Sequence, residues 1–189
     1  MKRVLQVIFC GLCMFAWVNA NAAMQTYTFD PMHTSVTWHV NHFGFSNPSG
    51  KWYANGTLMF DESAPQKSQV KVAIQLDSLD TGIAKFNEHI LSAAFLDAKK
   101  YPVAMFVSNR VEVINKNTLN VYGVLDLHGT AVPITLVVTI NQVGIHPYLK
   151  KQAIGVSAVS TIYRSDFGIK TYLPGVGDAV KLNIEAEAE

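Results

Sequence analysis

The sequence contains six histidines, a residue type that can bind metal ions or act in acid–base catalysis. His39 and His42 are separated by two residues, a spacing that could form a metal pair on a helix. The alternating residues around them predict a strand instead, on which they point to opposite faces. His33 shares a face with His39 but lies six residues away, about 20 Å along an extended chain. The other three are spread along the chain: His89, His128 and His146. We therefore predict no metal site.

Nucleophile and phosphate-binding motifs are also lacking. Gly155-Val156-Ser157 lies inside an alternating run, not at a strand-to-helix turn, and no Gly-x-Ser-x-Gly sequence occurs. Gly175-Val176-Gly177 follows Pro174 and is typical of a turn. The most suggestive polar groupings are Asp30 beside His33 and Arg164 near Asp166. We interpret both as structural hydrogen bonds or ion pairs.

Aromatic residues gather in two parts of the sequence. One group lies late in a predicted strand and at its exit: Trp38, His42, Phe43 and Phe45. The other is spread over a predicted helix, a strand and a loop: Phe86, Phe95, Phe106 and Phe167. These side chains could fill a core, or they could line a cavity, because an eight-stranded barrel is just wide enough to hold one ligand. The residues alone leave both interpretations open.

The beginning of the chain predicts export. Lys2 and Arg3 precede a 15-residue apolar run, Val4–Val18, and Ala20-Asn21-Ala22 resembles a signal-peptidase site. We expect a signal peptide at residues 1–22, with cleavage after Ala23 and an uncleaved anchor as alternatives. The run is shorter than the roughly 20 residues that span a bilayer as a helix.

Composition narrows the class of protein further. Both cysteines, Cys10 and Cys13, lie in the leader, so the mature chain has neither a disulfide nor a thiol nucleophile. The 167 residues that follow the leader suit one domain, 23–189. The formal charge of +1, less that of Lys2 and Arg3, becomes −1, which does not favour nucleic-acid binding.

Period-two alternation predicts a mostly antiparallel all-β fold of eight to ten strands. In residues 34–42 the even positions should face the core and the odd positions should not. Similar runs occur at 25–30, 50–60, 70–76, 103–107, 119–127, 132–140, 154–162 and 180–186. Only residues 80–94 have helical spacing, with Thr81 placed to cap the first turn. A barrel and a sandwich both bury such one-sided strands, so alternation does not choose between them.

Several separated segments together resemble the YceI-like family of periplasmic lipid- or polyisoprenoid-binding proteins. They are Tyr27-Thr28-Phe29-Asp30, His33-Thr34-Ser35-Val36, Leu79-Asp80-Thr81-Gly82, His89-Ile90-Leu91-Ser92, Phe95-Leu96-Asp97-Ala98, Lys100-Tyr101-Pro102, Gly123-Val124-Leu125-Asp126-Leu127-His128-Gly129 and Arg164-Ser165-Asp166-Phe167-Gly168-Ile169. Two segments depart from the family pattern. Residues 85–89 read Lys-Phe-Asn-Glu-His where Arg-Asp-x-His is common, and Phe95-Leu96 replaces a double Phe.

The resemblance implies a lipocalin-like, extended eight-stranded antiparallel β-barrel with an apolar lumen, located in the periplasm. It implies a long isoprenoid ligand, such as a polyprenyl phosphate or an isoprenoid quinone, and no catalytic cofactor. Transient contact with a membrane or a membrane redox protein, and a homodimer, are compatible with it. The candidate ligand-binding residues are Trp38, His42, Phe43, Phe45, Phe86, Asn87, His89, Phe95, Phe106, Arg164 and Phe167. Of these, Asn87, His89 and Arg164 are the candidates for contact with a polar head.

Three functional hypotheses follow from the sequence. The first is a non-catalytic lipid-binding or carrier protein. The second is an enzyme that acts on a lipid or quinone inside the same barrel, with His42 as the histidine that strand parity turns inward. The third is an interaction protein whose barrel is fully packed and has no continuous lumen.

Overall fold

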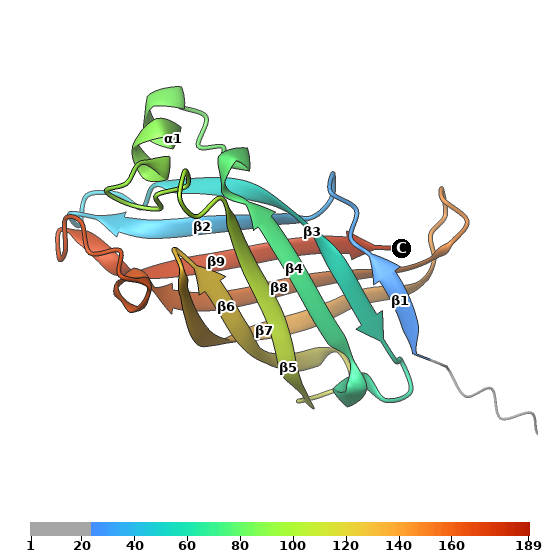
Figure 1. The fold of residues 1–189 in the computed structure, drawn as a ribbon. Coiled ribbons are helices and arrows are strands. Elements are labelled where there is room, and N and C mark those ends of the chain that lie inside the picture. Colours follow the sequence, from blue (N-terminus) through green and yellow to red (C-terminus); the bar gives the residue numbers. More distant parts are fainter. Residues whose placement is uncertain (1–23) are drawn as a thin grey trace, which may run out of the picture.

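The structure is a computed structural model that describes residues 24–189, so the expected signal peptide, residues 1–22, lies outside the described residues. Within that range the chain forms nine strands, one α-helix and three short 3₁₀ helices (Figure 1). In chain order they are β1 (Gln25–Thr28), β2 (Ser35–His42), β3 (Ser49–Phe60), η1 (Pro65–Lys67), β4 (Gln69–Gln75), η2 (Leu76–Ser78), α1 (Ala84–Leu91), β5 (Val103–Val113), β6 (Thr118–Leu127), β7 (Thr130–Ile145), β8 (Gln152–Tyr163), η3 (Arg164–Phe167) and β9 (Val176–Ala188).

Eight of the strands close into a ring. From β2 the order runs β9, β8, β7, β6, β5, β4 and β3, and β3 pairs with β2 again; all these pairings are antiparallel. The ninth strand, β1, pairs with the far half of β3, on the same edge as β2. The predicted all-β, eight-stranded antiparallel barrel with one helix is therefore confirmed.

The predicted side-chain parity is also confirmed on β2. Thr34, Val36 and Trp38 are buried inside the barrel, whereas Ser35 and Thr37 between them are not. On β6 the inward positions include Gly123, and a Cβ atom there would lie 2.5 Å from the ring of Phe106. This glycine therefore leaves the space in which the Phe106 ring lies inside the barrel.

The helix is shorter than predicted, and Thr81 does not cap it. The region 80–94 contains only α1, Ala84–Leu91, because Gly82 adopts a left-handed conformation (φ +76°) and Ser92 ends the last turn. Ile83 occupies the N-cap position without a side-chain cap. Thr81 lies too early to reach the first amides, and its hydroxyl donates to Oδ1 of Asn87 instead.

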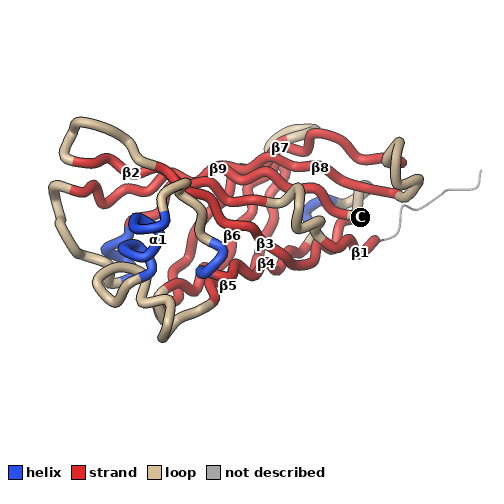
Figure 2. The backbone as a smooth tube through the Cα atoms, turned by 90° about the horizontal axis from the view of Figure 1, so that it is seen from above, coloured by secondary structure: helices blue, strands red, loops and turns tan. Residues whose placement is uncertain are grey.

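The barrel has two unlike ends. At one end lie α1, the β2–β3 loop and the β8–β9 loop, which we call the α1 end (Figures 1 and 2). At the opposite end lie the β1–β2 turn and the C-terminus. A second buried cluster packs there, formed by Tyr27, Phe29, Phe60, Ile154, Ala186 and Ala188.

The β1–β2 turn contains the predicted Asp30–His33 pair. Oδ2 of Asp30 lies 2.5 Å from Nδ1 of His33, so the two side chains share a local hydrogen bond that becomes an ion pair when His33 is protonated. The hydrogen bond and charge of Asp30 raise the pKa of His33, and the hydrogen bond to His33 lowers the pKa of Asp30.

A titration tests this pair. The stabilisation that His33 contributes is lost as pH rises through its raised pKa, and that of Asp30 is lost as pH falls through its lowered pKa. The pair therefore stabilises the fold at pH values between the lowered pKa of Asp30 and the raised pKa of His33. Replacing Asp30 by Asn should lower the pKa of His33 toward 6.5, as NMR of its ring protons would measure. A pKa that stays raised in Asp30→Asn, or falls equally in the distant Asp77→Asn, would contradict this.

Candidate ligand-binding cavity

A continuous cavity of about 350 Å³ occupies the inside of the barrel. Its walls are almost entirely apolar and come from all eight strands of the ring, together with α1. It extends from Phe29, Phe60 and Ile154 at the end opposite α1 to Phe86, His89 and Phe95 at the α1 end. The hypothesis of a fully packed barrel is therefore wrong, because it requires that no continuous lumen exists.

Many inward-facing aliphatic side chains confirm that the interior is not filled. Val72, Leu136, Ile140 and Val180 all line the cavity, yet each is only half-buried. Since the barrel wall surrounds these residues, the surface they leave uncovered faces the lumen. In a packed core such side chains would be covered by their neighbours. The lumen therefore presents apolar surface that a ligand could cover.

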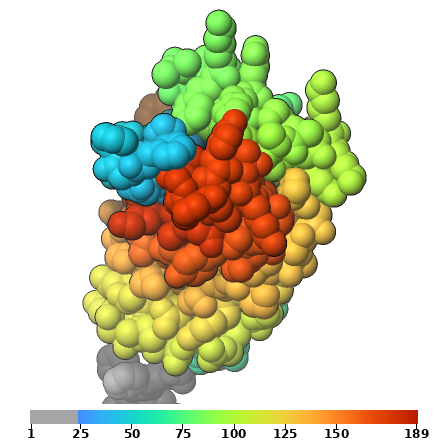
Figure 3. Space-filling view, turned by 90° about the vertical axis from the view of Figure 1, so that its left-hand side faces the viewer, coloured from blue at the N-terminus to red at the C-terminus, as the bar shows by residue number. Residues whose placement is uncertain are grey.

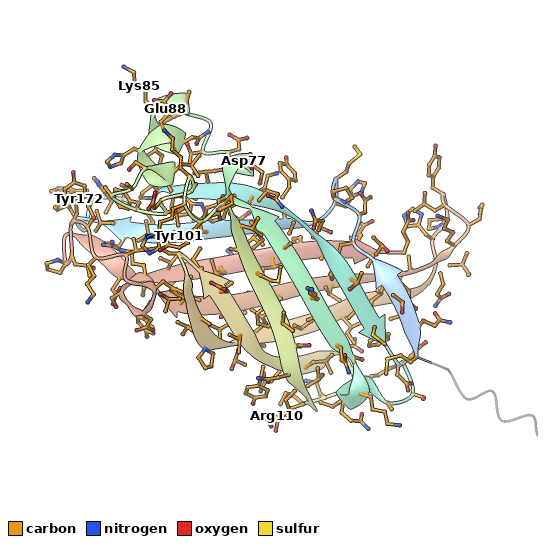
Figure 4. The ribbon with its side chains drawn as sticks, in the orientation of Figure 1. Asp77, Lys85, Glu88, Tyr101, Arg110 and Tyr172 are labelled. Carbon is orange, nitrogen blue, oxygen red and sulfur yellow. The ribbon has the colours of Figure 1, made fainter. Side chains whose placement is uncertain are left out.

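Polar groups lie at both ends of the cavity wall: Thr34, Ser68 and Gln69 at the end opposite α1, and His42, His89 and Tyr172 at the α1 end. His42 follows the parity of β2, His89 comes from α1, and Tyr172 comes from the β8–β9 loop. All three are exposed to solvent as well as lining the cavity, and Figure 4 shows Tyr172 at this extremity of the molecule. At the opposite end the only exposed lining residue among residues 24–189 is Gln69.

Ring contacts and a hydrogen bond connect the β8–β9 loop to α1 and to the segment that follows it, residues 92–95. The ring centroids of His89 and Phe95 are 4.8 Å apart, and Tyr172 stacks on His89 at 6.3 Å. The hydroxyl of Thr171 donates to the carbonyl of Ala94 at 2.5 Å. These contacts hold α1 at its end of the barrel, although none of the helix residues is fully buried.

Two tryptophans lie beneath α1 and differ in their hydrogen bonding. Trp38 is 6.1 Å from Trp52 and 6.4 Å from Phe86, measured between ring centroids. Nε1 of Trp52 donates to the carbonyl of Leu76. Nε1 of Trp38 is buried and has no hydrogen-bond partner among the described residues, which is uncommon for a buried indole.

Arg164 is a buried structural residue. Its guanidinium donates to four backbone carbonyls of the β8–β9 region, those of Ile169, Thr171, Val176 and Gly177. Burial lowers the pKa of Arg164, and the charge of Asp178 opposes that shift. The predicted structural hydrogen bonds of Arg164 are present, but they go to backbone carbonyls and not to Asp166, and the carboxylate whose charge acts on the guanidinium is that of Asp178. The side chain of Arg164 touches the cavity wall while holding the loop together.

The structure brings seven of the eleven candidate residues to the cavity: Trp38, His42, Phe86, His89, Phe95, Phe106 and Arg164. The other four lie elsewhere: Phe43, Phe45, Asn87 and Phe167. Phe43 and Phe45 are exposed because the chain leaves the barrel after His42. Asn87 binds Thr81, and Phe167 is only 1% exposed because η3 packs it against its neighbours.

Other wall residues were not among the candidates. Trp52 and Tyr172 line the α1 end, and the aliphatic residues of β4 and β7 make up much of the wall. Strand parity could have identified Trp52, since it alternates with Ala54 on β3. Nothing in the sequence indicates that the β8–β9 loop brings Tyr172 to α1.

Two features are absent from the described region. Within residues 24–189, no three His, Cys, Asp or Glu side chains come together as metal ligands would. Over the same range, no helix has the length and apolar character needed to cross a membrane.

Comparison with known proteins identifies the family. The model of the YceI-like domain matches residues 27–188. The chain belongs to the YceI-like family. A UPF0312 protein of Pseudomonas putida is 34% identical over 171 residues, which cover 90% of this chain and 88% of that protein.

Solved structures share the fold of this YceI-like protein. BcnA of Burkholderia cenocepacia superimposes with a TM-score of 0.75 at 25% identity, over 85% of this chain and 99% of BcnA. A polyisoprenoid binding domain from Saccharophagus degradans, implicated in plant cell wall breakdown, has a TM-score of 0.66 at 14% identity. That match covers 86% of this chain and 97% of the domain, and it shows the common fold alone.

Proposed function

We propose that this YceI-like protein is a non-catalytic periplasmic binding or carrier protein for a long apolar lipid, a polyisoprenoid or an isoprenoid quinone. The observation that carries the proposal is the continuous apolar lumen, about 350 Å³ in volume, that runs along the barrel. A solved domain of the same fold is described as polyisoprenoid binding, which fits this ligand class.

Burial of apolar surface would supply most of the affinity. Each CH₂ group that leaves water contributes about 0.8 kcal/mol, so a few isoprene units offset the cost of ordering the chain. An elongated ligand suits this cavity because its walls are apolar from Phe60 to Phe95.

The polar head of the ligand would stay at the α1 end. His42, His89 and Tyr172 reach solvent there, so a head group can keep its water while the tail lies in the barrel. Trp38, which has an unpartnered indole N–H beneath α1, lies next to this region. Arg164 is less suited to hold a head group, because four carbonyls already occupy its guanidinium.

A periplasmic location agrees with the signal peptide that the sequence predicts at residues 1–22. Transient contact with a membrane or a membrane redox protein, and a homodimer, remain predictions of the sequence. Of these expectations, a carrier of insoluble lipid requires contact with a membrane.

Mass spectrometry of a solvent extract of the purified protein tests the proposal. We expect a co-purified lipid with a long isoprenoid chain, and uptake of an isoprenoid quinone by the delipidated protein from detergent. No extracted lipid together with no uptake would contradict the proposal. A bound lipid converted to a new product would favour an enzyme instead, and His42→Ala would then abolish turnover while binding persists.

A further inference from the structure

Two neighbouring loops form the rim of the barrel at the α1 end: residues 43–48 and residues 168–175. The amide of Phe43 donates to the carbonyl of Gly175 at 2.6 Å, and the Phe43 ring lies directly over that glycine. Figure 3 shows the two loops side by side, the first cyan and the second red-orange, with the green α1 region above them. We call these two loops the rim.

The rim exposes three aromatic side chains, of which Tyr172 also stacks on His89, whereas Phe45 has no ring contact within residues 24–189. Phe45 is 93% exposed, Tyr172 is 58% exposed and Phe43 is 53% exposed. Phe43 and Tyr172 also adopt left-handed backbone conformations, with φ of +53° and +61°, which are unusual for bulky residues. At 93% exposure, Phe45 buries almost no apolar surface in the free protein, so a partner that covered this ring would gain that burial.

The charge of the rim favours a partner with an anionic surface. Lys170 is the only charged residue in the two loops, and it is exposed. A surface of Phe and Tyr side chains with a cationic residue and no carboxylate is complementary to an anionic bilayer. Tyr side chains favour the level of the lipid head groups, Phe rings insert their apolar surface, and a nearby Lys adds attraction to anionic lipid.

The rim is also continuous with the lumen. His42, immediately before the first loop, lines the cavity, and Tyr172 in the second loop both lines the cavity and faces solvent. A chain that leaves a bilayer at the rim could therefore enter the barrel without crossing water. We propose that the rim is the docking surface for an anionic lipid bilayer, through which the ligand is loaded and released. The loading step rests on the proposed function.

The opposite end offers a matched control. Tyr148, in the β7–β8 turn, is 86% exposed and stands beside two lysines, Lys150 and Lys151. The buried cluster that includes Phe29 and Phe60 packs at that end. If the bilayer docks for access to the lumen, Tyr148 should not contribute.

The experiment compares Phe45→Ser with Tyr148→Ser. Flotation with vesicles of phosphatidylcholine and phosphatidylglycerol measures docking, and the rate of quinone uptake from the same vesicles measures loading. Phe45→Ser should weaken docking and slow uptake about tenfold, or about 1.4 kcal/mol, because the variant loses the burial of the Phe ring in the bilayer. Lys170→Gln should weaken docking about fivefold on these vesicles and little on phosphatidylcholine alone. Tyr148→Ser should behave as wild type.

Uptake of quinone from detergent separates this inference from the proposed function. Phe45 does not line the cavity, so Phe45→Ser should take up quinone from detergent as wild type does. Equal flotation of Phe45→Ser and wild type would overturn the rim as a docking surface, as would an equal loss in Tyr148→Ser. Failure of every variant, wild type included, to take up quinone from detergent would overturn the proposed function, whatever flotation shows.

Discussion

Replacing Ala158 by Phe is expected to weaken binding of a long-chain isoprenoid about 100-fold while the barrel stays folded. Ala158 lies on β8, faces the cavity and is 5% exposed. A benzyl group there would occupy lumen that the ligand needs, and displacing three or four carbon groups costs about 3 kcal/mol. The dissociation constant of a fluorescent quinone analogue would measure the loss.

The next residue on the strand supplies the control. Val159 faces the outside of the barrel and is 50% exposed, so Val159→Phe adds similar volume away from the lumen. That variant should bind the quinone analogue as wild type does. If Ala158→Phe also binds unchanged, with a far-ultraviolet circular dichroism spectrum like that of wild type, the ligand does not occupy the middle of the barrel.

Replacing Arg164 by Met is expected to lower the free energy of unfolding by about 4 kcal/mol. Methionine is similar in length but donates no hydrogen bonds, so four carbonyls around the β8–β9 loop lose their charged donor. Hydrogen bonds to a charged group contribute about 1.5–3 kcal/mol each, and the losses are not additive. Urea unfolding followed by tryptophan fluorescence would measure the change.

Two variants distinguish this role from a simple effect of charge. Arg164→Lys keeps the charge but has no planar fork, so it should restore only part of the stability. Asp166→Asn removes the carboxylate that the sequence placed nearest, and it should change the free energy of unfolding by less than about 0.5 kcal/mol. A loss below about 1 kcal/mol in Arg164→Met would show that the loop does not depend on the guanidinium.

Local pattern was a reliable guide to the strands and a weaker guide to their limits. The alternation around Val36 and Trp38 correctly assigned the inner face of β2, because side chains on a strand alternate wherever that strand lies. The helix was found in the right region but begins later than predicted. Its start depends on the left-handed turn at Gly82 and on the bond between Thr81 and Asn87, which spacing alone does not encode.

For the candidate site, the sequence could identify residues on strands but could not place residues in loops. Inward positions on strands, such as Trp38 and Phe106, could be selected from parity. Phe43 and Phe45 could not be separated from them, because sequence proximity does not show where a chain leaves the barrel. The approach of Tyr172 to His89 joins segments more than 80 residues apart and depends on the folded β8–β9 loop.

The sequence by itself predicted a mostly antiparallel β fold and contains no Gly-x-Ser-x-Gly motif, since both follow from residue type and local spacing. The YceI-like resemblance extended this to a barrel and a lipid. Only the tertiary structure decided that the barrel closes through β3–β4 and β2–β9 and that its interior is open. Closure depends on pairing between distant strands, and an open lumen depends on whether the inward side chains together fill the space that the ring encloses. The fold also decides where the six histidines lie: within residues 24–189, His42 and His89 line the cavity and the other four do not.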